Sequence, residues 1–230
     1  MSVLCVCPVR GGSKSIPKKN LASLGGVPLV VRVLRAAKAA TLVDRLVVST
    51  EDDEIAGVCR GEGVEIIDRP AELAQDSTGS LPVIQHAVRT VEQDGFRPDY
   101  IVTLQATYPF ITTANIDSLI EAIQGSEVDS ATTLFPAPYR YHPFNARHMN
   151  EDGTASFTFA EEKLKFPNRQ AAPEFYFFGN LLISTYKTLM EDGALYGKRT
   201  APVVVTALES FDIDDQEDLD MAEFLMSRQR

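Results

Sequence analysis

The stretch Val3 to Asn20, VLCVCPVRGGSKSIPKKN, joins a short apolar run to a loop rich in glycine and positive charge. Its apolar part, residues 3–9, is typical of a strand that is buried on both faces of a parallel sheet. In such sheets ligands bind at the carboxyl ends of the strands, which is where this loop begins. The stretch therefore predicts an α/β protein with a ligand site directly after its first strand.

Further apolar runs alternate with helical patterns along most of the chain. The predicted strands are residues 3–9, 45–50, 64–68, 100–105 and 130–135. The predicted helices are residues 29–40, 52–60, 81–93 and 116–124, with Ser80 and Thr113 as candidate caps. Strand and helix patterns return in residues 176–183, 185–191, 202–207 and 217–227. This alternation predicts a doubly wound, mostly parallel sheet with right-handed crossovers.

Residues 136–175 interrupt the alternation with prolines and scattered aromatic residues. A segment of this kind does not have the pattern of another strand and helix. We expect it to form a small irregular or β-rich lobe, inserted into a single domain that spans residues 1–230.

The composition limits the classes of function. The chain has 230 residues, of which 44% are hydrophobic, and can bury a substantial core. No apolar run approaches the roughly 20 residues of a membrane-spanning helix, so no membrane partner is expected. No basic segment precedes a long apolar one at the start, which predicts a cytoplasmic protein. Cys5, Cys7 and Cys59 are predicted to be buried, reduced thiols, which fits that compartment.

Positive charge is concentrated in the first part of the chain. Residues 1–43 contain seven lysines and arginines and no acid, although the whole chain has a formal net charge of −10. Nucleic-acid binding needs a basic surface with many phosphate contacts, so no nucleic-acid partner is expected. A local anion site within an acidic protein fits the distribution better.

The glycines and cations of the first loop have the properties of a phosphate site. Gly11 and Gly12 let the backbone approach a ligand and turn its N–H groups toward an anion. Arg10 can neutralise a polyphosphate as a bidentate donor, and Lys14 and Lys19 can do so as point charges. The loop is neither a Walker motif nor G-x-G-x-x-G. The alternative, a solvated turn, is the weaker interpretation because no acid accompanies the cations.

The loop sequence RGGSKSIPKKN, residues 10–20, resembles the signature of the acylneuraminate cytidylyltransferases, which make CMP-sialic acid and related CMP-activated nonulosonic acids. Five further segments resemble motifs of that family, in order along most of the chain. They are VVSTED at 47–52, RPAELA followed by Asp76 at 69–76, LQATYP at 104–109, RQ at 169–170 and DID at 212–214. Each is weak alone, but six in the right order identify the chain as a member of the family.

The resemblance implies a Rossmann-like nucleotidyltransferase that joins CMP from CTP to the anomeric hydroxyl of a 2-keto acid sugar and releases pyrophosphate. The implied catalytic residues are Arg10, Lys14, Lys19, Asp212 and Asp214. The implied nucleotide contacts are Arg10, Gly11, Gly12, Ser13, Asn20, Arg69 and Ser80. The implied sugar contacts are Gln105, Thr107, Arg169, Gln170 and Asn180. Family members work as dimers, so the inserted lobe is expected to serve a homodimer contact and the sugar site.

Asp212 and Asp214 have the pattern of a magnesium site. They are two residues apart in an extended segment, so both carboxylates share one face while Ile213 turns inward. Mg²⁺ prefers such hard oxygen ligands, and the family's DID motif has this role. The expected cofactor is therefore Mg²⁺, and most neighbouring acids belong to a solvated helix start.

Two implied nucleotide contacts have a second interpretation. The Ser80 hydroxyl can select cytosine together with Arg69, or can cap the helix that follows. Asn20 can contact phosphate or metal-bound water, or can belong to a turn. Both alternatives stay open at the level of sequence.

The match is weaker in the expected sugar pocket. The family's L-Q-P-T-S-P-L-R is LQATYPFI in residues 104–111, which is bulkier and lacks the arginine. The family's N-G-A-I-Y-I is GNLLI in residues 179–183, and Asn145 stands where sialic-acid members have a lysine. Arg147 is a candidate to replace that lysine, and His148 beside it is a weaker candidate for a carboxylate contact. We predict retained CTP chemistry with a different, more apolar acceptor.

Other functions remain to be distinguished. A 3-deoxy-octulosonate cytidylyltransferase, or another sugar nucleotidyltransferase, is a sibling hypothesis, although the G-G-S-K form of the first loop disfavours the former. A non-catalytic nucleotide-binding module is a different class, but such a module has little need of a metal-binding pair. His86 falls within a helical pattern and is interpreted as a packing or surface residue.

Overall fold

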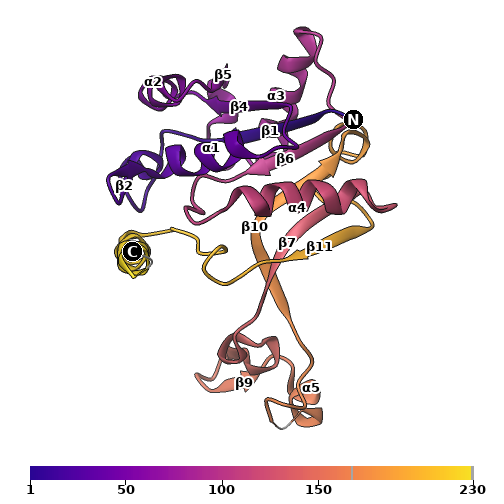
Figure 1. Ribbon diagram of the computed structural model, residues 1–230. Helices are drawn as coiled ribbons and strands as arrows, with labels where there is room; N and C mark the ends of the chain where they lie inside the picture. Colours follow the sequence, from indigo (N-terminus) through magenta and orange to yellow (C-terminus); the bar gives the residue numbers. More distant parts are fainter. Residues whose placement is uncertain (167, 229–230) are drawn as a thin grey trace.

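The structure is a computed structural model that describes residues 1–166 and 168–228 (Figure 1). Its main sheet has seven strands in the order β11-β7-β10-β6-β1-β4-β5. The strands are β1 (Val3–Pro8), β4 (Arg45–Thr50), β5 (Glu65–Asp68), β6 (Tyr100–Leu104), β7 (Ser130–Pro136), β10 (Tyr176–Thr185) and β11 (Thr200–Val204). Only β10 runs antiparallel to its neighbours, β6 and β7. The prediction of a mostly parallel α/β sheet is confirmed.

Helices cover both faces of the sheet, as expected for a doubly wound fold (Figure 1). On one face lie α1 (Leu29–Ala39), α2 (Asp53–Gly61) and α4 (Thr113–Gln124). On the other lie α3 (Ser80–Gln93) and the short π-helical segment Lys187–Glu191. In β1, Cys5 and Cys7 pack on the first face and Leu4 and Val6 on the second, which explains its unbroken apolar run.

The connections between strands determine where a ligand site can form. From β1 the chain proceeds through β4 and β5 on one side, and then returns to place β6 on the other side of β1. Such a reversal of strand order opens a crevice at the carboxyl ends of the strands. The loops that follow β1 and β6 meet at this crevice.

Two predicted helix caps are wrong by one residue. The N-cap of α3 is Gly79, so Ser80 is the first helical residue and caps nothing with its side chain. The N-cap of α4 is Thr112, which forms a reciprocal capping box with Asn115. The tendency of Ser and Thr to cap helices does not distinguish the N-cap from its immediate neighbour.

A small hairpin and the last helix form a third layer next to the crevice. The hairpin consists of β2 (Ser23–Leu24) and β3 (Val27–Pro28), and it packs against α6 (Gln216–Ser227). Ile213, just before α6, is fully buried among apolar residues of this layer. The packing holds the segment that carries Asp212 and Asp214 against the loop after β1.

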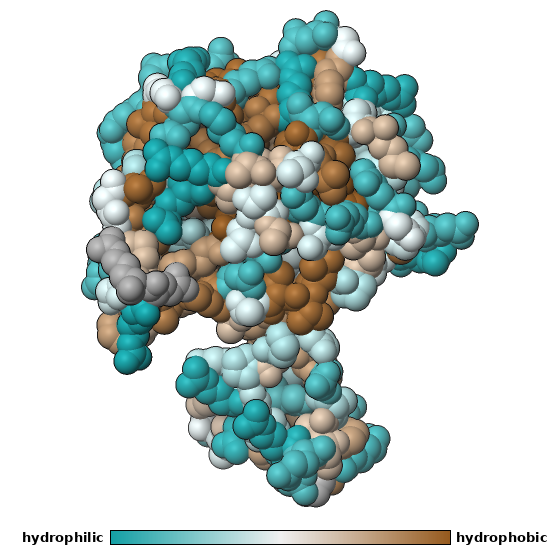
Figure 2. All heavy atoms as spheres, in the orientation of Figure 1, coloured by the Kyte–Doolittle hydropathy of each residue, from teal (hydrophilic) through white to brown (hydrophobic). Residues whose placement is uncertain are grey.

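The inserted segment forms a lobe at the end of a two-stranded arm. Strands β7 and β10 continue beyond the rest of the sheet and support the lobe, which stands apart from the body (Figure 1). The lobe contains β8 (Arg147–Met149), β9 (Ala155–Phe157) and α5 (Ala160–Lys165). His142 is at its centre, in edge contact with Phe144 and Phe175. Figure 2 shows the narrow waist between lobe and body, with apolar surface on the body beside it.

The three cysteines are free and buried, as predicted. Burial raises the pKa of the Cys5 thiol to about 12, and burial also raises the pKa of Cys59, to about 11. Thiols with such pKa values are poor nucleophiles at neutral pH. In residues 1–166 and 168–228, no helix is both long enough and apolar enough to span a bilayer.

Candidate active site

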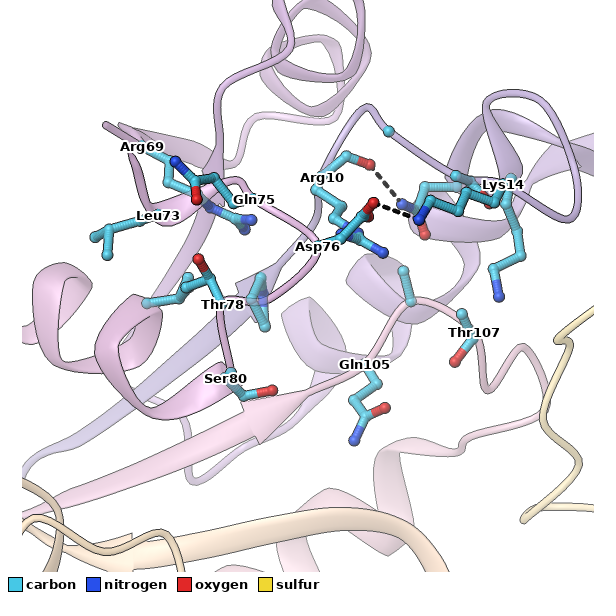
Figure 3. A pocket seen from close by; sticks show the side chains of 18 of the residues that line it. Arg10, Lys14, Arg69, Leu73, Gln75, Asp76, Thr78, Ser80, Gln105 and Thr107 are labelled. Carbon is cyan, nitrogen blue, oxygen red and sulfur yellow. Dashed lines mark hydrogen bonds and ion pairs between the residues drawn. The ribbon is translucent and has the colours of Figure 1, made fainter. Parts of the chain in front are cut away.

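A polar cavity of about 440 Å³ lies at the carboxyl ends of β1, β5 and β6 (Figure 3). Most of the residues predicted to bind nucleotide or to act in catalysis line it. These are Arg10, Gly12, Ser13, Lys14, Lys19, Asn20, Arg69, Ser80 and Asp214, together with the predicted sugar contacts Gln105 and Thr107. Segments distant in sequence therefore meet at one site.

The first loop is tied directly to the segment that carries the two aspartates. Lys19 Nζ donates to the carbonyl of Ile213 at 2.8 Å and lies 3.6 Å from Asp214 Oδ1. Ser15 donates its hydroxyl hydrogen to the Asp214 carbonyl. The Ile213 N–H in turn donates to the Thr107 carbonyl at 2.9 Å, in the loop after β6. These bonds connect the loop after β1, the loop after β6 and the segment that carries the two aspartates.

Asp212 and Asp214 occupy different surroundings although they are close in sequence. The Asp214 side chain is 80% exposed and lines the cavity, whereas Asp212 is partly buried behind it. Asp212 Oδ1 is buried and accepts no hydrogen bond from the residues that the structure describes. Burial raises the pKa of Asp212, and the nearby Asp214 carboxylate raises it further. A carboxylate oxygen in this state is suited to a cation.

Asp76 joins two cations of the first loop. Its carboxylate lies 2.7 Å from Arg10 Nη1 and 2.6 Å from Lys14 Nζ. Figure 3 shows Asp76 between these two side chains, with Ser80 and Gln105 on the opposite side of the cavity. Hydrogen bonds from Lys14 and from Arg10 lower the pKa of Asp76, which is therefore ionised at neutral pH. The cations that were predicted to bind phosphate are paired with an acid of the loop between Arg69 and Ser80.

Arg69 is a buried arginine at the rear of the cavity. Its Nε donates to Ser49 Oγ at 3.3 Å, and its Nη2 donates to the Ser49 carbonyl. Glu51 Oε2 lies 3.7 Å from Arg69 Nη1. Burial lowers the pKa of Arg69, and the charge of Glu51 opposes this shift.

The loop glycines differ in what they contribute. Gly12 lines the cavity, but Gly11 is not among the residues of its wall. The Gly11 N–H donates to Glu51 Oε1 at 2.8 Å, so it is satisfied within the protein. A Cβ atom at Gly11 would lie 2.3 Å from Asp52 Oδ2, which makes glycine necessary there because of this close approach. Asp52 itself caps α2 by accepting from Glu54 and Ile55 N–H groups.

Two predicted sugar contacts, Arg169 and Gln170, lie away from the main cavity. They line a separate cavity of about 340 Å³ in the lobe, together with Tyr139 and His142. A third, Asn180, is fully buried in the interior. Its amide donates to the Glu209 carbonyl at 2.7 Å and its oxygen accepts from Thr133 at 2.9 Å. In this chain Asn180 ties β10 to the segment before Asp212.

Aromatic residues fill the region where the motifs depart from the family. Tyr108 is buried and packs edge-on against Phe178, with ring centroids 6.2 Å apart. Burial and the adjacent Asp212 raise the pKa of Tyr108, so its hydroxyl stays protonated. This aromatic pair lies outside the wall of the main cavity, next to Asp212.

The lobe retains positive charge near the position of the missing lysine. Lys163 Nζ, from α5, donates to Asn145 Oδ1 at 2.7 Å. Arg147 instead lies over the Phe157 ring, 4.4 Å from its centroid. His148 is exposed in β8, and His86 is partly buried in α3 outside the cavity wall.

Sequence reasoning missed several residues of the cavity and its surroundings. Gln75, Thr78 and Gly79 line it, and all lie in the loop between Arg69 and Ser80. Their position after a parallel strand was the available signal. Glu51 was missed as well, although it directly follows β4.

Comparisons with known proteins identify the family of this chain. A family model described as "Cytidylyltransferase" matches residues 4–229, so the chain belongs to the cytidylyltransferase family. CMP-N,N'-diacetyllegionaminic acid synthase from Campylobacter jejuni is 30% identical over 231 residues, 98% of this chain and 95% of the relative. Pseudaminic acid cytidylyltransferase from the same species is 28% identical over 227 residues, 98% of this chain and 96% of the relative. The family resemblance read from the motifs is confirmed.

A solved structure supports the fold. CMP:2-keto-3-deoxy-manno-octonic acid synthetase complexed with CTP superimposes with a TM-score of 0.74 and 18% identity, and the match covers 100% of both chains. At this identity the likeness concerns the fold alone. It agrees with the seven-stranded sheet described above.

Proposed function

We propose that this chain is a CTP-dependent cytidylyltransferase that activates a 2-keto acid sugar of the nonulosonic class. The observation that carries the proposal is the convergence of Arg10, Lys14 and Lys19 with Asp214 in one cavity. Polyphosphate needs the cations, and a phosphate-bound divalent metal needs the acids. The names of the relatives support both the nucleotide and the acceptor class.

In the proposed reaction, the anomeric hydroxyl oxygen of the acceptor attacks the α-phosphorus of CTP. The new P–O bond joins CMP to the sugar, the bond to the β-phosphate breaks, pyrophosphate leaves, and the hydroxyl proton passes to solvent. Arg10 and Lys14 neutralise the charge of the leaving pyrophosphate. Lys19, which donates to the Ile213 carbonyl, would hold a phosphate of CTP close to the two aspartates.

Asp212 and Asp214 fit a magnesium ion as its protein ligands. The buried Oδ1 of Asp212 has no donor in the described residues, and Asp214 presents its carboxylate to the cavity. Bound Mg²⁺ would neutralise phosphate charge during transfer. Without a metal ion, burial and the charge of Asp214 raise the pKa of Asp212, and the charge of Lys19, which pairs with Asp214, opposes this shift.

Arg69 and Ser80 are the proposed selectors of the base. Both line the cavity, and α3 begins at Ser80, so its hydroxyl is not used as a helix cap. A site that hydrogen-bonds the polar edge of cytosine leaves buried groups unpaired when another base enters. This arrangement favours CTP over UTP.

The acceptor sugar is proposed to bind at the interface of two subunits. Gln105 and Thr107 of one subunit form one side of its pocket, and the lobe of the second subunit forms the other side. Arg169, Gln170 and Lys163 are in the lobe, which stands apart from the body of the same chain (Figure 1). A homodimer in which the arms cross would bring these groups to the partner's sugar. The positive charges of Arg169 and Lys163 suit the carboxylate of a 2-keto acid. We place this reaction in the cytoplasm, where CTP is available.

The test is pyrophosphate release with Mg²⁺, in which CTP, UTP, GTP and ATP are each combined with a panel of eight- and nine-carbon 2-keto acid sugars. We expect release with CTP and a nine-carbon sugar, and none with Asp214→Ala. Release only with an eight-carbon sugar would favour the octulosonate alternative. Binding of CTP without release in any combination would favour a non-catalytic nucleotide-binding module.

A further inference from the structure

The carboxyl end of β4 lies between two parts of the proposed nucleotide site. One is the loop at residues 10–20, which we call the phosphate loop, and the other is Arg69, which is proposed to bind the base. On one side, the Val9 N–H donates to the Ser49 carbonyl at 2.9 Å. On the other, the Arg69 N–H donates to the Thr50 carbonyl, also at 2.9 Å. The short segment from Ser49 to Glu51 is therefore in contact with both halves of the nucleotide site.

Glu51 is the charged residue of this segment, and its carboxylate contacts both the phosphate loop and Arg69. Oε1 accepts from the Gly11 N–H at 2.8 Å, and Oε2 lies 3.7 Å from Arg69 Nη1. The side chain is 24% exposed, whereas that of Arg69 is only 4% exposed. One carboxylate thus contacts the phosphate loop with one oxygen and the buried guanidinium with the other.

The guanidinium of Arg69 depends on this carboxylate. Moving a cation out of water is costly unless an opposite charge and hydrogen bonds compensate for it. The Ser49 oxygens that accept from Arg69 are neutral. Among the described residues, Glu51 supplies the only carboxylate in ion-pair contact with Arg69. Without that charge, the guanidinium would shift toward other acceptors or toward solvent.

We propose that Glu51 is a positioning residue that couples selection of the base to binding of the phosphates. It orients Arg69 for the pyrimidine and simultaneously fixes the phosphate loop at Gly11. The proposal rests on the proposed cytidylyltransferase function, because it assigns Arg69 to the base and the loop to the phosphates. Glu51 itself does not line the cavity, so it acts through these two groups.

The test compares Glu51→Gln with Glu54→Gln in the full chain. Glu54 is a matched control, because it pairs with Lys18 of the same loop, and neither residue lines the cavity. Glutamine keeps an acceptor for Gly11 but removes the charge from Arg69. We expect Glu51→Gln to raise the KM for CTP about tenfold and to lower the CTP-to-UTP preference about tenfold, with kcat within about threefold. Glu54→Gln should change each quantity less than about twofold.

Glu51→Asp tests the role of charge separately, because it keeps the carboxylate on a side chain that is one methylene shorter. It should recover most of the preference for CTP that Glu51→Gln loses. An unchanged preference in Glu51→Gln, even with a lowered melting temperature, would overturn the proposal and leave Glu51 a structural residue. The same conclusion would follow if the aspartate variant were no more selective than the glutamine variant. A wild-type chain without CTP turnover would refute the proposed function instead.

Discussion

At the residue scale, Asp76 would compete with an incoming triphosphate for the two cations of the proposed site. The carboxylate contacts both Arg10 and Lys14, and its lowered pKa keeps it charged at neutral pH. CTP must displace it or bind beside it, and either event weakens the attraction of the cations for phosphate.

Asp76→Asn preserves the shape of the side chain and removes this competing charge. We expect the dissociation constant of CTP, measured by calorimetry, to fall about three- to tenfold, with the larger effect at low salt. The control is Glu54→Gln, which removes a similar ion pair outside the cavity. Weaker CTP binding by Asp76→Asn would contradict this prediction. It would mean that Asp76 holds Arg10 and Lys14 in place for CTP instead of competing with CTP for them.

The Asp212 carboxylate is expected to support activity but to lower the stability of the folded protein. Its carboxylate is partly buried, lacks a donor to Oδ1 in the described residues, and has a raised pKa because of burial. Because the pKa is raised in the folded state, ionisation of Asp212 lowers the free energy of unfolding at pH values above the ordinary carboxyl pKa. This loss of stability is therefore present at pH 7.

Asp212→Asn should lower turnover about 100-fold or more, because it removes a proposed ligand of the metal ion. It should not lower the melting temperature of the metal-free protein, because it also removes a buried charge. Adding Mg²⁺ should raise the melting temperature of the wild type but not that of the variant. An equal rise in both proteins would show that Asp212 does not bind the ion.

At the scale of elements, the irregular pairing of β7 and β10 positions the segment that carries the aspartates. The register shifts between Phe178 and Leu182. Within this irregularity Thr133 Oγ1 accepts from the N–H groups of Asn180 and Leu181, each at 2.8 Å. The Asn180 amide then reaches the Glu209 carbonyl, which leads toward Asp212.

Gly179→Ala tests this element. An added Cβ would lie 2.7 Å from Thr133 Oγ1, which its hydrogen bonds hold in place. We expect a loss of about 2 to 3 kcal/mol in the free energy of unfolding, measured with urea, because the buried strands must separate. Gly57→Ala, in the exposed middle of α2 with open space around it, should instead stabilise by up to about 1 kcal/mol. Similar effects of the two substitutions would contradict this account.

Sequence reasoning predicted the strands and helices of the sheet well because their signals are local. An unbroken apolar run such as that of β1 requires packing on both faces, which only a few architectures provide.

The site was harder to predict, since side chains from four loops complete it. The ion pairs of Asp76 and the double contact of Glu51 depend on which loops become neighbours, and no spacing in the chain encodes that. Asn180 was assigned from a motif in which it and Gly179 are exchanged, and the exchange places its amide in the interior.

At the scale of the whole molecule, the position of the lobe predicts that two subunits share each active site. Arg169 lies in the lobe cavity, whereas Asp214 lies in the main cavity of the body. Variants Arg169→Ala and Asp214→Ala should each be nearly inactive as homodimers. In an equal mixture that is allowed to exchange subunits, heterodimers retain one intact site, so activity should return to about a quarter of the wild-type level.

Two controls accompany the mixing experiment. Light scattering should give the mass of a dimer for the wild type and for both variants. Mixing Asp214→Ala with Lys19→Ala, which alter the same cavity, should restore nothing. Absence of recovery with Arg169→Ala, together with a dimeric mass, would contradict a lobe that acts on its partner.

The central claim is that this chain transfers CMP from CTP to a nonulosonic acid, and mass spectrometry of the product tests it most directly. The protein is incubated with CTP, Mg²⁺ and pseudaminic, legionaminic or N-acetylneuraminic acid. The account predicts a CMP ester of one of these sugars, formed in equal amount with pyrophosphate and lost in Asp214→Ala. Formation of a UMP or AMP ester in preference to a CMP ester, or nucleotide hydrolysis with no sugar ester, would contradict it.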